Sequence, residues 1–161
     1  MNVPTVPGAV TRAIVTYPDD RLRAVCAPVG VVDAEIRQLV IDMLATMYAA
    51  PGRGLAAPQV GVLKRLFVID VTWRDGAPDP MICIDPELSD PSDVMVAREE
   101  GCLSIPDHPV IVTRPDAVSL TYTDVTGQRL TRRLTGIAAT CAQHEFDHLN
   151  GVLILDHESP A

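Results

Sequence analysis

Two histidines four residues apart, His144 and His148, constrain the fold more than any other feature of the sequence. On an α-helix this spacing places both imidazoles on one face, with Cβ atoms about 5–6 Å apart, which suits two ligands of one divalent metal. Glu145 follows the first histidine, where its carboxylate can reach a water molecule at the metal rather than the metal itself. Asn150-Gly151 is a helix-stop signal. The segment therefore predicts a short helix with a metal-binding face.

The residues around this motif predict that the helix is buried. Its small and apolar positions are Ile137, Ala138, Ala139, Ala142 and Leu149. Two histidines and a glutamate inside a protein are costly unless a metal or hydrogen bonds compensate them. The alternative is a surface helix that carries two histidines by chance, because short motifs also match at random.

Length and composition predict one catalytic domain, residues 1–161, with no membrane span. No apolar run approaches the roughly 18 residues that a bilayer requires. The net charge of −8, with Lys64 the only lysine, argues against a nucleic-acid surface. The N-terminus has no secretory signal, and the four cysteines form no Cys-x-x-Cys pair. We therefore expect reduced thiols and a cytoplasmic protein.

The N-terminal half predicts an arm, a helix and a strand. Residues 1–13 are expected to be irregular. Asp33 can cap a helix that continues to about Ala49, because Ile36, Leu39, Val40, Met43 and Met47 follow one stripe at helical spacing. The apolar, β-rich run of residues 66–71 predicts a buried strand.

The middle of the chain predicts further strands before the metal helix. Residues 81–84 are expected to form a short strand that stops before Asp85-Pro86, and residues 87–98 a solvated excursion. Residues 118–134 alternate apolar and polar side chains around the turn residues 124–127, which predicts a β-hairpin.

A His-Glu-x-x-His helix needs a third protein ligand. Cys141 is excluded because it lies seven residues from His148, about 10.5 Å along the helix axis, too far for both to bind one ion with His144. The metzincin pattern, typical of one class of zinc endopeptidase, requires a third histidine at position 154, which is Ile154. The third ligand must therefore come from upstream, where Cys102 and His108 are both candidates.

A second unusual stretch is Gly52-Arg53-Gly54, followed by small residues and Gln59. The two glycines let another chain approach the backbone closely. A phosphate-binding loop is disfavoured, because the stretch lacks a Gly-Lys-Ser/Thr ending. A tight loop before a strand remains the structural alternative, with Gln59 a polar side chain in an apolar run that needs a partner.

Taken together, three collinear motifs resemble those of the peptide deformylases. They are Gly52-Arg53-Gly54-Leu55-Ala56-Ala57-Pro58-Gln59, Glu100-Gly101-Cys102-Leu103-Ser104 and His144-Glu145-Phe146-Asp147-His148. The resemblance extends from Tyr17 to about Asp156. It implies an α+β fold, with small mixed or antiparallel sheets packed around a central metal-binding helix, and a monomer.

The resemblance implies that Cys102, His144 and His148 hold one divalent metal ion. Fe(II) is implied as the physiological ion, with zinc, nickel or cobalt able to replace it. Glu145 is then the base that takes a proton from water and delivers it to the leaving amine. The side-chain amide of Gln59 and the backbone N–H of Leu103 are expected to stabilise the oxyanion.

The implied substrates are N-formylmethionyl peptides, the formylated N-termini of nascent chains. The residues expected to contact them are Gly52, Arg53, Gly54, Glu100 and Gly101, with the glycine backbone pairing to the peptide as an added β-strand.

The sequence departs from the family pattern at two places. Arg53 stands where the family usually has an apolar residue, so it either stays solvated or shifts preference toward acidic or polar peptides. The printed sequence also ends without the basic C-terminal helix common in the family, which leaves ribosome docking open. A deformylase-like paralogue with altered peptide preference, and a non-catalytic metal-binding protein, are therefore the alternative functions.

Overall fold

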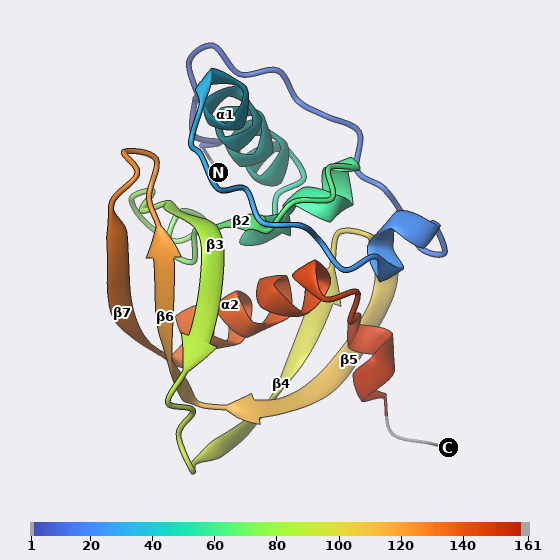
Figure 1. The fold of residues 1–161 in the computed structure, drawn as a ribbon. Helices are drawn as coiled ribbons and strands as arrows, with labels where there is room; N and C mark the ends of the chain where they lie inside the picture. The colour runs from blue at the N-terminus through green and yellow to red at the C-terminus, as the bar shows by residue number, and fades with distance from the viewer. Residues whose placement is uncertain (1, 159–161) are drawn as a thin grey trace.

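The computed structural model describes residues 2–158, in which two α-helices pack against two antiparallel sheets (Figure 1). The helices are α1 (Ala34–Ala49) and α2 (Gly136–Leu149). The five-stranded sheet has the order β1 (Gly54–Ala56), β2 (Leu66–Ile69), β3 (Met81–Ser89), β6 (Ala117–Thr123), β7 (Arg129–Thr135). The second sheet is the ribbon of β4 (Met95–Cys102) and β5 (Ile105–Pro115). The predicted α+β architecture is confirmed, with α2 between the sheet and the ribbon.

Helix α1 forms where the apolar stripe predicted it. The carboxylate of Asp33 accepts a hydrogen bond from the backbone N–H of Ile36 at 2.9 Å, which satisfies one free donor of the first turn. Met43 and Met47 are fully buried in the core that α1 shares with β1 and β2. The two methionines are therefore core residues, as their spacing indicates.

The N-terminal arm, described from residue 2, is irregular as predicted, but side chains of α1 hold it. The backbone N–H of Val10 donates to Asp42 Oδ1 at 2.9 Å, and that of Arg12 donates to Thr46 Oγ1 at the same distance. The Arg12 guanidinium also pairs with Asp42 at 3.0 Å. Residue 1 and residues 159–161 lie outside the described part of the chain.

Two predictions in the middle of the chain were wrong. Strand β3 does not stop before Asp85 but continues to Ser89, because a bulge between Ile84 and Glu87 absorbs Asp85-Pro86. Asp85 has a φ of 47°, and its carboxylate accepts the backbone N–H of Val29 at 2.7 Å. The expected solvated excursion of residues 87–98 instead contains the end of β3 and the start of β4.

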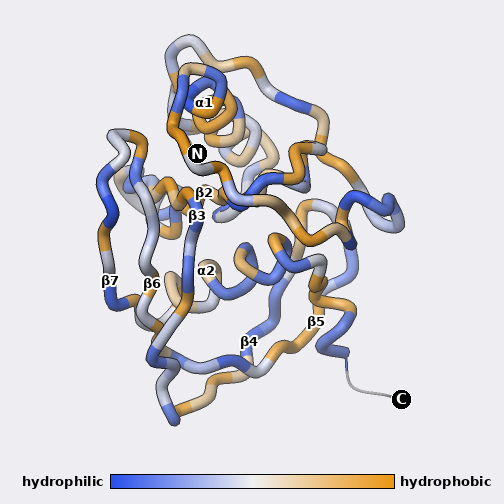
Figure 2. Tube along the Cα trace, viewed as in Figure 1, coloured by the Kyte–Doolittle hydropathy of each residue, from blue (hydrophilic) through white to orange (hydrophobic). Residues whose placement is uncertain are grey.

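Helix α2 confirms the predicted helix around His144 and His148 and its stop at Asn150-Gly151. Figure 2 shows hydrophilic turns of α2 in the interior of the molecule, where its polar face meets the β4–β5 ribbon. The helix ends at Leu149, and Gly151 follows with a φ of 72°. A Cβ atom there would lie 2.4 Å from the backbone oxygen of Arg23, so this stop requires glycine.

One expected core position of α2 was wrong. Ile137 is 40% exposed, because it lies in the first turn at the mouth of a cavity. In residues 2–158, neither helix is long and apolar enough to cross a membrane.

Candidate metal centre

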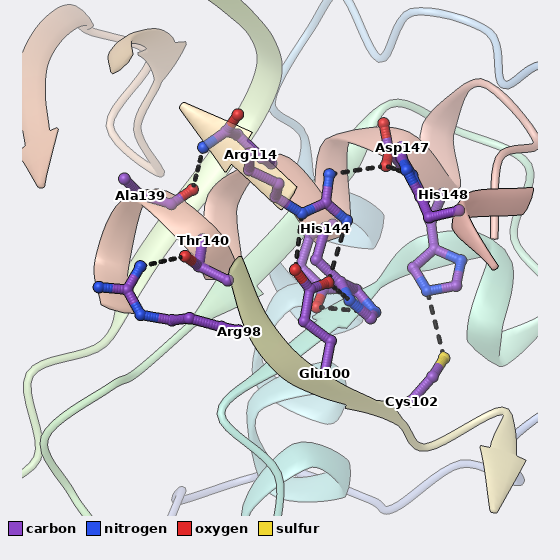
Figure 3. A network of polar contacts seen from close by, with 12 residues as sticks. Arg98, Glu100, Cys102, Arg114, Ala139, Thr140, His144, Asp147 and His148 are labelled. Carbon is purple, nitrogen blue, oxygen red and sulfur yellow. Dashed lines mark hydrogen bonds and ion pairs between the residues drawn. The ribbon is translucent and has the colours of Figure 1, made fainter. Parts of the chain in front are cut away.

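Cys102, His144 and His148 converge between the ribbon and α2 (Figure 3). One sulfur or nitrogen atom of each lies within 4.8 Å of those of the other two, and Cys102 Sγ is 3.4 Å from His148 Nε2. Of the two upstream candidates, His108 is exposed and lies 2.5 Å from the Glu158 carboxylate instead. The structure therefore selects Cys102 as the third potential ligand.

A buried ion-pair chain orients His144. Its Nδ1 lies 2.9 Å from Glu100 Oε1, and the Arg114 guanidinium donates to both Glu100 oxygens at 2.7 and 3.0 Å. A third Arg114 nitrogen reaches Asp147 at 3.0 Å. This chain fixes the imidazole so that Nε2 is directed toward Cys102 and His148, as in sites where a carboxylate positions a metal-binding histidine.

These contacts add a positioning role to the one expected for Glu100. Its side chain is 6% exposed, and both carboxylate oxygens are bonded to Arg114 or His144. These bonds give Glu100 a role in orienting His144, and its contact with substrate stays a prediction. Gly101 and Leu103 line the cavity beside it and remain candidate substrate contacts.

The donors and their charges fit a divalent cation. Burial holds the pKa of His148 well below its usual range, so the ring is neutral and its lone pair is available. Burial also lowers the pKa of His144, but the charges of Glu145, Cys102 and Glu100 outweigh it and raise that pKa well above the usual value. The same anionic surroundings favour a metal cation, and one thiolate with two imidazoles is a donor set for zinc, iron, nickel or cobalt.

Glu145 lies beside the three potential ligands. It is 4% exposed, and its Oε2 is 3.9 Å from His144 Nε2. Burial raises the pKa of Glu145 to about 7, and Oε1 has no hydrogen-bond partner among the described residues. Because a buried oxygen without a partner is costly, this atom is positioned to bond a molecule held in the site.

Gln59 has the partner that its position in an apolar run requires. Its Oε1 accepts the backbone N–H of Ala56 at 2.9 Å, and its Nε2 donates to Ser104 Oγ at 3.0 Å. A backbone N–H can only donate, so this bond fixes which end of the amide is oxygen. The NH₂ group therefore faces Cys102, 3.6 Å from its sulfur.

Gly52 and Gly54, the two glycines of the first motif, each let a different side chain lie against the backbone. A Cβ at Gly52 would lie 2.8 Å from Leu103 Cδ1, and one at Gly54 would lie 2.5 Å from Glu145 Oε2. Strand β1 is also an edge strand. The backbone N–H of Asp70 donates to the carbonyl oxygen of Arg53, so these two residues form a hydrogen-bonded pair. In an antiparallel ladder, bonded and non-bonded pairs alternate along the strand. The N–H and C=O of the next residue, Gly54, therefore point away from β2 to the free edge of β1.

A cavity of about 460 Å³ joins these groups and opens to solvent. It extends from Gln59 and Cys102, past Glu145, to Arg53 at the exposed rim. All the predicted site residues except His148 line it: Gly52, Arg53, Gly54, Gln59, Glu100, Gly101, Cys102, Leu103, His144 and Glu145.

Sequence reasoning missed Arg114 and Ser104, which hold Glu100 and Gln59 in place. A signal for Arg114 exists in the strand pattern. Val110 and Val112 face the core, and Arg114 continues the same face at 6% exposure. An arginine in a core-facing register predicts a buried carboxylate partner. Ser104 offers no comparable signal.

The fold and the site together point to one class, the metal-dependent hydrolases with a His-Glu-x-x-His helix, here with Cys102 as a third potential ligand. The sequence matches the pattern of the polypeptide deformylases over residues 11–161. The peptide deformylase of Rhizobium meliloti (strain 1021) is 48% identical over 148 residues, covering 92% of this chain and 85% of that protein. The chain belongs to the polypeptide deformylase family.

Solved structures agree in fold. The peptide deformylase of Thermotoga maritima superposes with a TM-score of 0.88 at 40% identity, covering 94% of this chain and 99% of that one. A class I type b peptide deformylase from Acinetobacter baumannii with Met-Ala-Ser bound gives 0.85 at 32% identity, covering 92% and 98%. The chain is accordingly a metal-dependent amide hydrolase that removes the formyl group from N-formylmethionyl peptides.

Proposed function

We propose that Cys102, His144 and His148 hold the metal ion of this hydrolase and that Glu145, Gln59 and Leu103 carry its reaction. The observation that supports this most is the placement of three potential ligands around the carboxylate of Glu145, at the inner end of the cavity. Fe(II) is the proposed physiological ion, with zinc, nickel or cobalt as substitutes. When bound, such an ion supplies Lewis acidity and lowers the pKa of water.

Glu145 moves the proton in this proposal. Water adds to the formyl carbon, the carbon–nitrogen bond breaks, and formate and a free peptide amine result. The Glu145 carboxylate accepts the proton that the water loses and returns it to the leaving nitrogen. Its buried, unpartnered Oε1 and its pKa of about 7 suit a group that is protonated and deprotonated in one cycle.

Gln59 and Leu103 stabilise the negative charge that develops on the formyl oxygen. The Gln59 NH₂ group is held by Ala56 and Ser104, so it need not reorganise when charge appears. Leu103 follows Cys102 directly, and its backbone N–H is the proposed second donor. Its side chain packs against Gly52, which limits the movement of this segment.

The peptide binds along the free edge of β1. The N–H and C=O of Gly54 face that edge and can pair with an extended peptide as an additional strand. Arg53 and Gly101 line the same cavity and contact the bound peptide. The tripeptide Met-Ala-Ser seen on the Acinetobacter baumannii relative is the product expected from formyl-Met-Ala-Ser.

We further propose that residues 1–161 act as one catalytic domain, as a monomer in the cytoplasm, on the formylated N-termini of nascent chains. Size-exclusion chromatography with light scattering tests the monomer, and fractionation of cells tests the location.

The test of function is release of formate from formyl-Met-Ala-Ser by protein purified without oxygen and loaded with Fe(II) or Ni(II). We expect turnover by the wild type and its loss in Glu145→Ala, with one metal ion bound per chain in both. Metal binding without turnover in the wild type would instead favour the non-catalytic metal-binding protein.

A further inference from the structure

Arg98 lies in the wall of the cavity but has no role in the mechanism above. It shares one face of β4 with Glu100 and Cys102, because alternate residues of a strand point to the same side. That face meets α2, and Figure 3 shows Arg98 reaching the helix at Thr140, before His144 along the chain. The guanidinium Nη1 donates to Thr140 Oγ1 at 2.9 Å, and both residues line the cavity.

The cavity wall at Arg98 offers a place for the side chain of a formylated residue. The formyl carbon sits at Glu145, and the α-carbon of that residue is only two bonds away, across the amide nitrogen. From Glu145 and His144 the cavity continues along the N-terminal half of α2, past Cys141, to Thr140 and Ile137. A side chain that extends along this wall is directed toward the bonded pair Arg98–Thr140.

This end of the cavity offers donors and positive charge. An arginine has five N–H donors; Arg98 donates to Thr140 and forms an ion pair with the partly exposed Asp116 carboxylate at 3.5 Å, which leaves other donors free. Arg53 lies at the exposed rim of the same cavity and makes no ion pair with another described residue. The acidic residues that line the cavity lie away from Arg98 or are already paired. Glu99 is on the opposite face of β4, and Asp107 is exposed on β5. Glu100 is paired with Arg114, and Glu145 lies at the reacting end.

We propose that Arg98 is a specificity-determining residue that admits a carboxylate-bearing side chain on the formylated residue. Thr140 acts as its positioning residue, because the hydroxyl fixes the guanidinium against the wall. The proposal rests on the deformylase function and adds a substrate class to it, formyl peptides that begin with an acidic residue of methionine's length.

Three peptides of matched length test this: formyl-Glu-Ala-Ser, formyl-Gln-Ala-Ser and formyl-Met-Ala-Ser. The measured quantity is the ratio of kcat/KM for the glutamate peptide to that for the methionine peptide. Arg98→Leu is expected to lower the ratio about tenfold, the factor of one hydrogen bond to a charged group. The fall should appear as a raised KM for the glutamate peptide, because the lost contact is to the bound side chain.

Thr140→Val keeps the charge and tests the positioning. It is expected to lower the same ratio by a smaller factor, again through KM, with the glutamine peptide less affected. Arg132→Gln on β7, outside the cavity, removes an equal charge and should leave the ratio unchanged. Metal content of each variant verifies that the site has folded.

The outcomes distinguish a failure of the role of Arg98 from a failure of the deformylase function. An unchanged ratio in metal-loaded Arg98→Leu, or wild-type protein that cleaves only the methionine peptide, would overturn the role of Arg98 and leave the deformylase function standing. If no formyl peptide releases formate, the function itself fails and the role of Arg98 fails with it.

Discussion

Gly54 and Glu145 fit against each other without space for a side chain at residue 54: a Cβ atom there would lie 2.5 Å from Oε2 of the carboxylate. The glycine of the edge strand and the base on α2 are therefore in contact across the floor of the cavity. Because the carboxylate is the end of a flexible side chain, it would yield before the backbone does. The lack of a Cβ atom at residue 54 thus leaves the space that the Glu145 carboxylate occupies.

Gly54→Ala is expected to lower kcat by about 10- to 100-fold, since a displacement on the order of 1 Å at a reacting group carries that cost. The melting temperature should change little, because a rotated carboxylate relieves the clash. Formate release and a thermal melt measure the two effects. Gly76→Ala is the matched control, because the nearest atom to its Cβ is a backbone oxygen at 3.6 Å. Unaltered kcat in Gly54→Ala would show that Glu145 can work from another position.

Gln59→Leu is expected to reduce kcat by the equivalent of about 2.7–4 kcal/mol, the usual cost of one lost oxyanion donor. The metal should be retained, because Gln59 is not among the three potential ligands. Metal content by mass spectrometry and steady-state kinetics on formyl-Met-Ala-Ser decide this. Near-normal turnover of the metal-loaded variant would remove Gln59 from the mechanism.

Much of the site could be predicted from the sequence because its chemistry depends on local spacing. His144 and His148 lie one helical turn apart, and Gln59 is conspicuous as an amide in an apolar run. What escaped prediction depends on contacts between distant segments. Arg114 meets Glu100 and Asp147 only after β4 and β5 pair and pack on α2, and the positioning role of Glu100 depends on those bonds.

The fold was predictable to a similar extent. Asp33 and the apolar stripe after it specify α1 through local rules of capping and periodicity. The continuation of β3 past Asp85-Pro86 could not be predicted, because a proline and an aspartate in the left-handed region normally end a strand. Here a bulge keeps Glu87 to Ser89 paired with β6, and that pairing is a long-range contact.

Cys102→Ser is expected to weaken metal binding, because a serine hydroxyl stays protonated where the thiolate contributes a negative charge and a soft donor. After dialysis against a chelator, the variant should hold far less than one metal per chain while the wild type stays loaded. Cys141→Ser is the control, since that partly buried thiol on α2 lies outside the three-ligand group. Equal metal retention by Cys102→Ser and the wild type would contradict the assignment.

Arg114→Leu is expected to destabilise the protein by about 3–5 kcal/mol, because it leaves Glu100 as a buried charge without its main partner. Urea unfolding of the metal-free protein measures this without the contribution of a bound ion. The double variant Arg114→Leu/Glu100→Gln should recover part of the loss, because no unpaired charge then remains. A double variant no more stable than the single one would mean that packing, rather than charge, makes Arg114 necessary.

Asp42 links the N-terminal arm to α1 and should make stability depend on pH. Burial raises the pKa of this carboxyl, but hydrogen bonds from Val10, Gln38 and Arg12 outweigh it and hold the pKa below its usual value. A lowered pKa in the folded state means that the stabilising contribution is complete above the unfolded value of about 3.9. The contribution is lost as pH falls below that value and through the folded pKa.

Asp42→Asn is therefore expected to cost about 1–3 kcal/mol of unfolding free energy at neutral pH, and less as the pH falls below about 4. Urea unfolding of both proteins across this range measures the difference. The acid sensitivity of the metal centre cancels, since both proteins share it. Asp75→Asn, in the loop between β2 and β3, is the control and should leave the unfolding free energy nearly unchanged, because its side chain is exposed and makes no hydrogen bond or ion pair with another described side chain. A cost for Asp42→Asn that stays constant down to pH 3 would mean that the arm is held by packing and not by the carboxylate.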